Sequence, residues 1–246
     1  MDILGGFTIA QIAVALLAAL GASFVRGLTG FGMAILLVPI LALALPPIEA
    51  VLVGNGLSVL IGLIELPRLV RGAERSAWII AAICVAATPL GLLALASTGA
   101  DIARLLIALI AFSAFIAVML PRRLEQPGPI TAASVGIVSG LMTGYAGMPG
   151  PPVVPYYVGR ELPRETAKTS MLLIFTIAAG SGLTSGAVMG MMAYSLATLS
   201  LMLFPAVILG NWLGEKASGA ISDPLWRTIV GVVLGAAAIA ALFRLF

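Results

Sequence analysis

The sequence predicts an all-α integral membrane protein made of two repeats of about five hydrophobic segments each, related by inverted topology, with one short broken segment in each repeat. Three observations predict it: the composition, the count of apolar segments, and a set of residues that recur between the two halves. Apolar residues make up 61% of the 246 residues and charged residues only 9%, and the mean hydropathy is +1.17. This composition leaves too little polar surface to solvate a globular protein of such length.

Ten apolar segments follow one another along the chain, five in each half. They cover residues 7–26, 28–45, 49–67, 77–97, 103–120, 130–146, 148–159, 167–190, 193–214 and 226–245. Several reach the ~20 residues that a helix needs to cross ~30 Å of hydrocarbon. Segment 148–159 is far too short and rich in proline, and 28–45 is slightly short. These two are expected to be discontinuous helices, which line the substrate site in transporters built from repeats.

Prolines and an acidic residue recur between the halves at a shift of 116 residues. The matching pairs are Pro39 and Pro155, Pro47 and Pro163, Glu49 and Glu165, and Pro89 and Pro205. Just upstream, at a shift of 114, Thr29-Gly30-Phe31 falls on Thr143-Gly144-Tyr145, so the second copy carries two extra residues in its Gly-Met-Pro-Gly-Pro-Pro run. The predicted repeats are therefore residues 1–121 and 122–246.

The positions of Lys and Arg predict how the segments cross the membrane, because cytoplasmic loops accumulate these residues. If all ten segments cross, 11 of the 13 basic residues lie on one side and only Arg104 and Arg244 on the other. If the two short segments dip in and return, the split is six to seven and carries no orientation signal. Equivalent loops also carry opposite charge bias: 46–49 has no basic residue, whereas its counterpart around Pro163 has three. We therefore expect ten crossings, both termini outside, and an inverted second repeat.

The composition also excludes most catalytic chemistry. The chain has no His and a single Cys, Cys84, so it can form no internal disulfide, His-Cys zinc site, Ser-His-Asp triad or CxxC redox pair. We expect no cofactor and no enzymatic activity. The net charge of +3 belongs to loop residues and reports orientation rather than nucleic-acid binding. The expected partners are a small anionic substrate and the lipid bilayer, with a homodimer left open.

Glycine-rich runs at the start of each short segment are the best candidates for a substrate site. Glycine allows close backbone approach, and helix N-termini offer N–H groups and a positive dipole end to an oxyanion. The alternative is that small residues merely allow tight helix packing in lipid, but the equivalent positions of the two runs favour a site. The second copy, with its extra residues, is expected to hold the more specific contacts. The predicted substrate-binding residues are Thr29, Gly30, Gly32, Asn55, Thr143, Gly144, Tyr145, Gly147, Gly150 and Ser170.

Three further polar residues each have two interpretations. Arg26 can attract an anion, or can extend to the interface as a residue at the end of a span. Asn211 can join two helices or bind the substrate. Glu65 is the most membrane-embedded acid, and a solvated or Arg-paired carboxylate is favoured for it over a proton-coupling site.

Several stretches of the chain resemble one family of permeases. They are the glycine motif around Thr29, the run GMPGPPVVPYY from Gly147 to Tyr157, and GNWLGEKASGAISDPLWRTIVGVVLG from Gly210 to Gly235. They look like the sulfite exporter TauE/SafE family, also called the 4-toluene sulfonate uptake permeases. The resemblance implies a multi-pass permease of the bacterial inner membrane for small sulfur-containing anions such as sulfite, sulfonates, sulfoacetate or thiosulfate. That family is usually described with seven or eight spans, fewer than the ten segments counted here.

Transport by alternating access is the favoured function. Transport of a small organic carboxylate is an alternative, because a backbone cradle suits carboxylates too. An intramembrane enzyme would have to use Glu65, or a Ser with Lys168, which is a weak constellation. A non-transporting assembly or sensor subunit gives no reason for paired broken spans.

Overall fold

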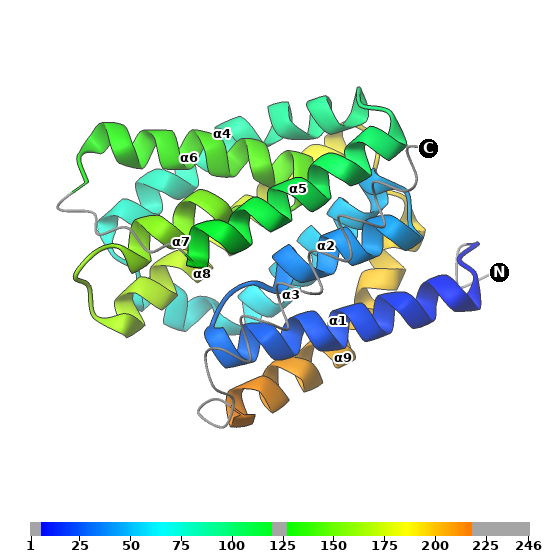
Figure 1. Ribbon diagram of the computed structural model, residues 1–246, viewed down its shortest axis with the longest axis horizontal. Helices are drawn as coiled ribbons and strands as arrows, with labels where there is room; N and C mark the ends of the chain where they lie inside the picture. Colours follow the sequence, from blue (N-terminus) through cyan, green and yellow to red (C-terminus); the bar gives the residue numbers. More distant parts are fainter. Residues whose placement is uncertain (1–5, 120–126, 218–246) are drawn as a thin grey trace.

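The computed structural model describes residues 6–119 and 127–217, and within these ranges all regular secondary structure is helical (Figure 1). The helices are α1 (Ile9–Thr29), α2 (Met33–Ala44), α3 (Pro47–Gly72), α4 (Arg75–Ala96), α5 (Ala100–Met119), α6 (Pro129–Ala146), α7 (Gly150–Val158), α8 (Arg164–Val188) and α9 (Tyr194–Ala217). They coincide with nine of the ten predicted segments, and the tenth, 226–245, lies outside the described residues. The prediction of an all-α protein is confirmed for the described ranges.

Five of the described helices are long and apolar enough to cross a membrane: α1, α3, α4, α8 and α9. Large apolar side chains cover their outward faces, among them Leu63, Leu90 and Leu201, which are at least half exposed. In water such a surface would be costly, whereas in a bilayer it contacts lipid chains. The chain is a multi-pass membrane protein.

Two pairs of parallel helices form opposite edges of the bundle, α1 with α9 and α4 with α6 (Figure 1). In the second pair Gly136, Gly140 and Gly144, spaced four residues apart on α6, lie directly on the backbone of α4. In the first pair Gly210 and Gly214 of α9 lie on the backbone of α1 in the same way. Small residues allow this close approach, which membrane helices use because lipid offers no hydrophobic drive for association.

The centre of the bundle is the antiparallel pair α3 and α8, the most buried of the five long apolar helices. They cross where Gly62 of α3 meets Thr176 of α8, and Gly182 of α8 meets Asn55 of α3. The neighbours are arranged in equivalent pairs: α8 also packs on α4, and α3 also packs on α9. If α3 is exchanged with α8 and α4 with α9, the contact of α3 with α9 becomes that of α8 with α4, and the contact of α3 with α8 is unchanged.

The two short helices start inside the bundle. At 12 and nine residues, α2 and α7 extend about 18 and 14 Å at 1.5 Å per residue, well short of the hydrocarbon thickness. The chain turns back between α1 and α2, and Gln11 Nε2 donates a hydrogen bond to Ala44 O at 2.9 Å. The last turn of α2 therefore lies beside the first turns of α1, and α2 runs antiparallel to α1.

The helix ends change one detail of the predicted repeat. A left-handed glycine caps both α1 and α6, Gly30 with φ 85° and Gly147 with φ 66°. The sequence match pairs Gly30 with Gly144, but Gly144 lies inside α6, three residues before the cap. Gly147 therefore holds the structural position of Gly30, and α6 continues three residues beyond Thr143, whereas α1 ends at the matching Thr29.

Candidate functional site

A cavity of about 50 Å³ lies where the N-terminal ends of α2 and α7 meet. Gly32 to Ile35 line it from the first half, and Gly147 to Gly150 from the second. Residues of the central helices α3 and α8 complete its wall, among them Ser58 and Thr176. Both discontinuous helices therefore direct the positive ends of their dipoles toward the same small space.

The first break presents unbonded amides to this cavity. Gly32, with φ 94°, caps α2 in a conformation that other residues rarely adopt. Leu36 is the first residue of α2 whose amide donates to a carbonyl of the turn, to Gly32 O at 3.4 Å. The amides of Met33, Ala34 and Ile35 precede it, so they have no carbonyl of this helix to donate to. This is the arrangement by which helix N-termini bind anions.

The second break presents fewer donors. The amide of Gly147 donates to Thr143 O at 2.8 Å, and that of Met148 to Met142 O at 3.3 Å, so both are used in capping α6. Two prolines, Pro151 and Pro152, then follow Gly150 in the first turn of α7. Proline has no N–H, so Gly150 is the only one of the first three residues of α7 that can donate.

One cation reaches the cavity. Arg26, near the end of α1, lines it and is only 7% exposed. Its Nη2 donates to Glu65 Oε1 at 2.7 Å, and its Nη1 to Asn211 Oδ1 at 2.7 Å. The hydroxyls of Ser58 and Thr176 also line the cavity, and each donates to its own helix, to Gly54 O and Leu172 O at 2.8 Å.

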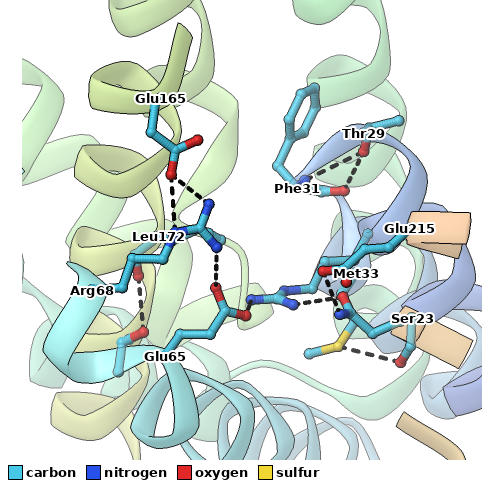
Figure 2. A network of polar contacts seen from close by, with 12 residues as sticks. Ser23, Thr29, Phe31, Met33, Glu65, Arg68, Glu165, Leu172 and Glu215 are labelled. Carbon is cyan, nitrogen blue, oxygen red and sulfur yellow. Dashed lines mark hydrogen bonds and ion pairs between the residues drawn. The ribbon is translucent and has the colours of Figure 1, made fainter. Parts of the chain in front are cut away.

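The ion pair of Arg26 continues into a row of charges shown in Figure 2. Glu65 Oε2 lies 3.9 Å from Arg68 Nη1, and Arg68 also binds Glu165 of α8. Asn211, which accepts from Arg26, donates to Glu215 Oε1 at 3.0 Å. The favoured interpretation of Glu65 as an Arg-paired carboxylate is confirmed. Asn211 joins α9 to α1 through Arg26.

A larger cavity of about 700 Å³ lies next to the first one. Phe31 is among the residues that line both. Arg164 and Lys168 line the larger cavity and make no ion pair with the residues that the structure describes. Arg160 lines it too and binds Glu74, while its guanidinium lies 5.1 Å from the centre of the Tyr156 ring. The larger cavity, called the vestibule below, is therefore lined by three basic residues and by two acids, Glu165 and Glu215.

The predicted site residues fall into three groups. Gly32, Gly147 and Gly150 line the small cavity, whereas Thr29 and Gly30 line the vestibule. Asn55, Thr143, Gly144, Tyr145 and Ser170 are among the lining of neither.

Each member of the third group has a local environment of its own. The side chain of Asn55 is buried without a hydrogen-bond partner among the described residues, and its Oδ1 lies 3.7 Å from where a Cβ on Gly147 would be. Thr143 donates to Ser139 O at 2.7 Å, and the Tyr145 hydroxyl to Thr98 at 3.3 Å. Ser170 accepts from the amide of Glu74 at 3.0 Å. A Cβ on Gly144 would overlap the carbonyl oxygen of Thr88.

Sequence reasoning missed two parts of this site. The amides of residues 33–35 carry no side-chain signal, because only the end of α2 leaves them unbonded. Thr176 lies in an apolar run, and only the crossing of α3 and α8 brings it opposite Ser58 in the cavity. Among the described residues no three Cys, Asp or Glu side chains stand close enough together to hold a metal ion.

The family comparison agrees with this membrane architecture. The sequence profile of the family described as sulfite exporter TauE/SafE matches residues 15–241. The chain belongs to the sulfite exporter TauE/SafE family. Comparisons with curated proteins and with solved structures found no match. The resemblance that the glycine and proline motifs indicated is thereby confirmed, and membership assigns this multi-pass protein to a family of membrane transporters rather than to a family of enzymes.

Proposed function

We propose that this protein moves a small sulfur-containing oxyanion, such as sulfite or thiosulfate, across the bacterial inner membrane by alternating access. The observation that carries the proposal is the small cavity that Arg26 and the first turn of α2 line together. Backbone amides at a helix start and a buried arginine are the donors that oxyanions prefer. Arg164 and Lys168 of the vestibule, which are unpaired among the described residues, attract anions from solution.

The size of the cavity favours small anions. A buried water needs about 10–15 Å³ of such volume, so about 50 Å³ accommodates on the order of three to five water molecules. Sulfite has four heavy atoms and thiosulfate five, so either fits without enlarging the cavity. An aromatic sulfonate would require Phe31 or Phe175 to move aside, since both line the wall.

We also propose that the two halves, residues 1–121 and 122–246, are inverted repeats that rock against each other around this site. The support is the exchange of equivalent packing: α1 on α9 matches α6 on α4, and α3 on α9 matches α8 on α4. The pair α3 and α8 is its own counterpart under this exchange. The cavity lies between the starts of α2 and α7, which are also counterparts. In transporters with such repeats the substrate site lies where the repeats meet near the bilayer midplane.

Flux measurements in proteoliposomes test the function. The purified full chain should take up sulfite or thiosulfate saturably, with weaker uptake of aromatic sulfonates and of small carboxylates. The panel is run with and without a pH gradient to identify proton coupling. A carboxylate transported best would redirect the proposal to organic acids. No saturable flux of any anion would overturn it in favour of a non-transporting subunit.

A variant of the vestibule provides the matched control for the site. Arg26→Gln should abolish flux, because it removes the cation of the small cavity. Lys168→Gln removes a cation from the vestibule only, and is expected to lower the rate at sub-saturating anion about threefold, with an effect that disappears at high salt. Equal loss of flux in both variants would contradict the assignment of the site to the small cavity.

A topology reporter tests the inversion separately. The reporter is fused near Pro47, the start of α3, or near Pro163, just before α8. The two fusions should report opposite sides of the membrane. A report from the same side would reject the inverted repeat while leaving the anion site untouched.

A further inference from the structure

We propose that Glu65 occupies the place of the substrate anion on Arg26, and that it transfers to Arg68 when an anion binds. The proposal rests on the proposed function, because it takes the small cavity as the anion site. It assigns to Glu65 the role of a positioning residue that acts through Arg26.

The first step concerns the charge of Arg26. Its side chain is 8% exposed, lines the cavity and binds Glu65 Oε1 at 2.7 Å. A buried guanidinium without a partner is costly, so the empty site needs an anion, and Glu65 supplies it. The pair is neutral overall, so an entering oxyanion must compete with the Glu65 carboxylate for the same cation. The anion gains the full charge of Arg26 only when Glu65 withdraws.

The second step concerns where Glu65 can go. Arg68 follows it by three residues on α3, and its Nη1 already lies 3.9 Å from Glu65 Oε2. The Arg68 side chain is 49% exposed, against 18% for Glu65, so it can turn to receive a second carboxylate without being desolvated. Figure 2 shows Glu65 and Glu165 on either side of Arg68. A small rotation of one side chain therefore exchanges one arginine partner for the other.

The third step links the exchange to the contact between the two halves. Arg68 on α3 binds Glu165 on α8, so it connects the first half to the second at this end of the bundle. When Glu65 turns to Arg68, two carboxylates share one guanidinium, and the ion pair between Arg68 and Glu165 weakens. Occupancy of the site is thereby transmitted to an ion pair between the halves. Release of the anion requires Glu65 to return to Arg26.

The charge-neutral variant Glu65→Gln tests the competition directly. Sulfite and thiosulfate binding to the purified full chain is measured by calorimetry, together with the melting temperature with and without anion. The variant should bind at least tenfold more tightly than the wild type, because the competing carboxylate is gone. It should melt lower than the wild type without anion and be stabilised more by anion, since binding to the folded state adds to stability. Its flux in proteoliposomes should fall, because the anion is released slowly.

Two control variants separate the switch from a general change of charge or loss of packing. Asp101→Asn changes the net charge equally, but its carboxylate lines neither cavity and binds Arg104 rather than Arg26. Its affinity should stay within twofold of the wild type. Glu65→Asp keeps the charge on a shorter side chain, and should tighten binding about threefold even if Glu65→Gln is recovered too poorly to measure. Affinity unchanged or weakened in both Glu65 variants would overturn the proposal.

The acceptor end of the exchange is tested by Arg68→Gln. Without Arg68 the displaced Glu65 has no second partner, so the anion should bind three- to tenfold more weakly. Arg71→Gln is the matched control, because Arg71 lies on the same helix and makes no ion pair with the described residues. Equal affinities in the two variants would overturn the transfer to Arg68. If the wild-type chain itself neither binds nor transports any anion of the panel, the proposed function fails rather than the switch.

Discussion

The break between α1 and α2 and the break between α6 and α7 have the same shape but different chemistry. Each follows a helix capped by a left-handed glycine, and each opens a short helix toward the same cavity. The first break leaves the amides of residues 33–35 unbonded and has Arg26 beside it. In the second break the amides of Gly147 and Met148 donate to carbonyls of α6. Pro151 and Pro152 occupy the first turn of α7 and have no N–H to donate.

The difference teaches that two breaks of the same shape can carry different chemistry. The first break has the buried Arg26 and unbonded amides beside the cavity, and the second has a proline-rich helix start with few donors. The longer second motif, which is richer in glycine and proline, predicts the more specific contacts on the second copy. Proline at a helix start has the opposite effect on donors, since each one removes an N–H.

The largest effect is expected at Gly144, which the sequence match paired with Gly30. Gly144→Leu should destabilise the fold by at least about 3 kcal/mol, because the α4 backbone lies where the side chain would be and cannot move aside. Melting temperature and size-exclusion profile in detergent measure this. Gly180→Leu is the control, since no atom lies within 4 Å of a Cβ there. A normal melting temperature for the Gly144 variant would mean that α4 and α6 do not pack as described.

The second effect compares the two breaks directly. Gly32→Ala meets nothing closer than Val25 at 3.8 Å, but its φ of 94° strains any other residue by about 1–3 kcal/mol. Relief of that strain should misalign the amides of α2 and lower flux at least tenfold. Gly147→Ala strains the second break, which supplies few donors, and should lower flux less than threefold. The reverse order of the two effects would place the donors in the second copy.

The third effect should make the second break resemble the first. Pro149→Ala restores an N–H at a residue that lines the cavity at the start of α7, and one added hydrogen bond is worth about 0.5–1.5 kcal/mol. Anion affinity, measured by calorimetry, should therefore rise by about three- to tenfold. Pro155→Ala, in the interior of α7, adds an amide that does not face the cavity and serves as the control. A rise of equal size in both variants would indicate a general change in helix stability.

The smallest effect is expected from the two hydroxyls of the cavity wall. Ser58→Ala and Thr176→Val each remove one polar group and keep the volume nearly unchanged, so each should weaken anion binding about threefold. The double variant measures their coupling, because residues lining one small cavity are expected to be non-additive. Additive effects would indicate that the two hydroxyls do not contact one anion together.

Much of the architecture was predictable because membrane helices are encoded locally. Nine described helices match predicted segments, and the short lengths of α2 and α7 were visible as short apolar runs. The site was only partly predictable. Gly32, Gly147 and Gly150 do line the cavity, but Gly144, which has the same local sequence signal, packs against α4. A single sequence does not distinguish a glycine that opens a turn from one that admits a neighbouring helix.

The sequence alone determined that the chain is a helical membrane protein in which two short apolar segments stand among longer ones. Those properties depend on composition and segment length, which are local or additive along the chain. Only the tertiary structure decided which groups meet: the unbonded amides of α2, the cavity-facing Arg26, and the placement of Glu65 between Arg26 and Arg68. Partners far apart in the chain, such as Arg68 and Glu165, are brought together by helix packing, and their spacing in the sequence carries no record of it.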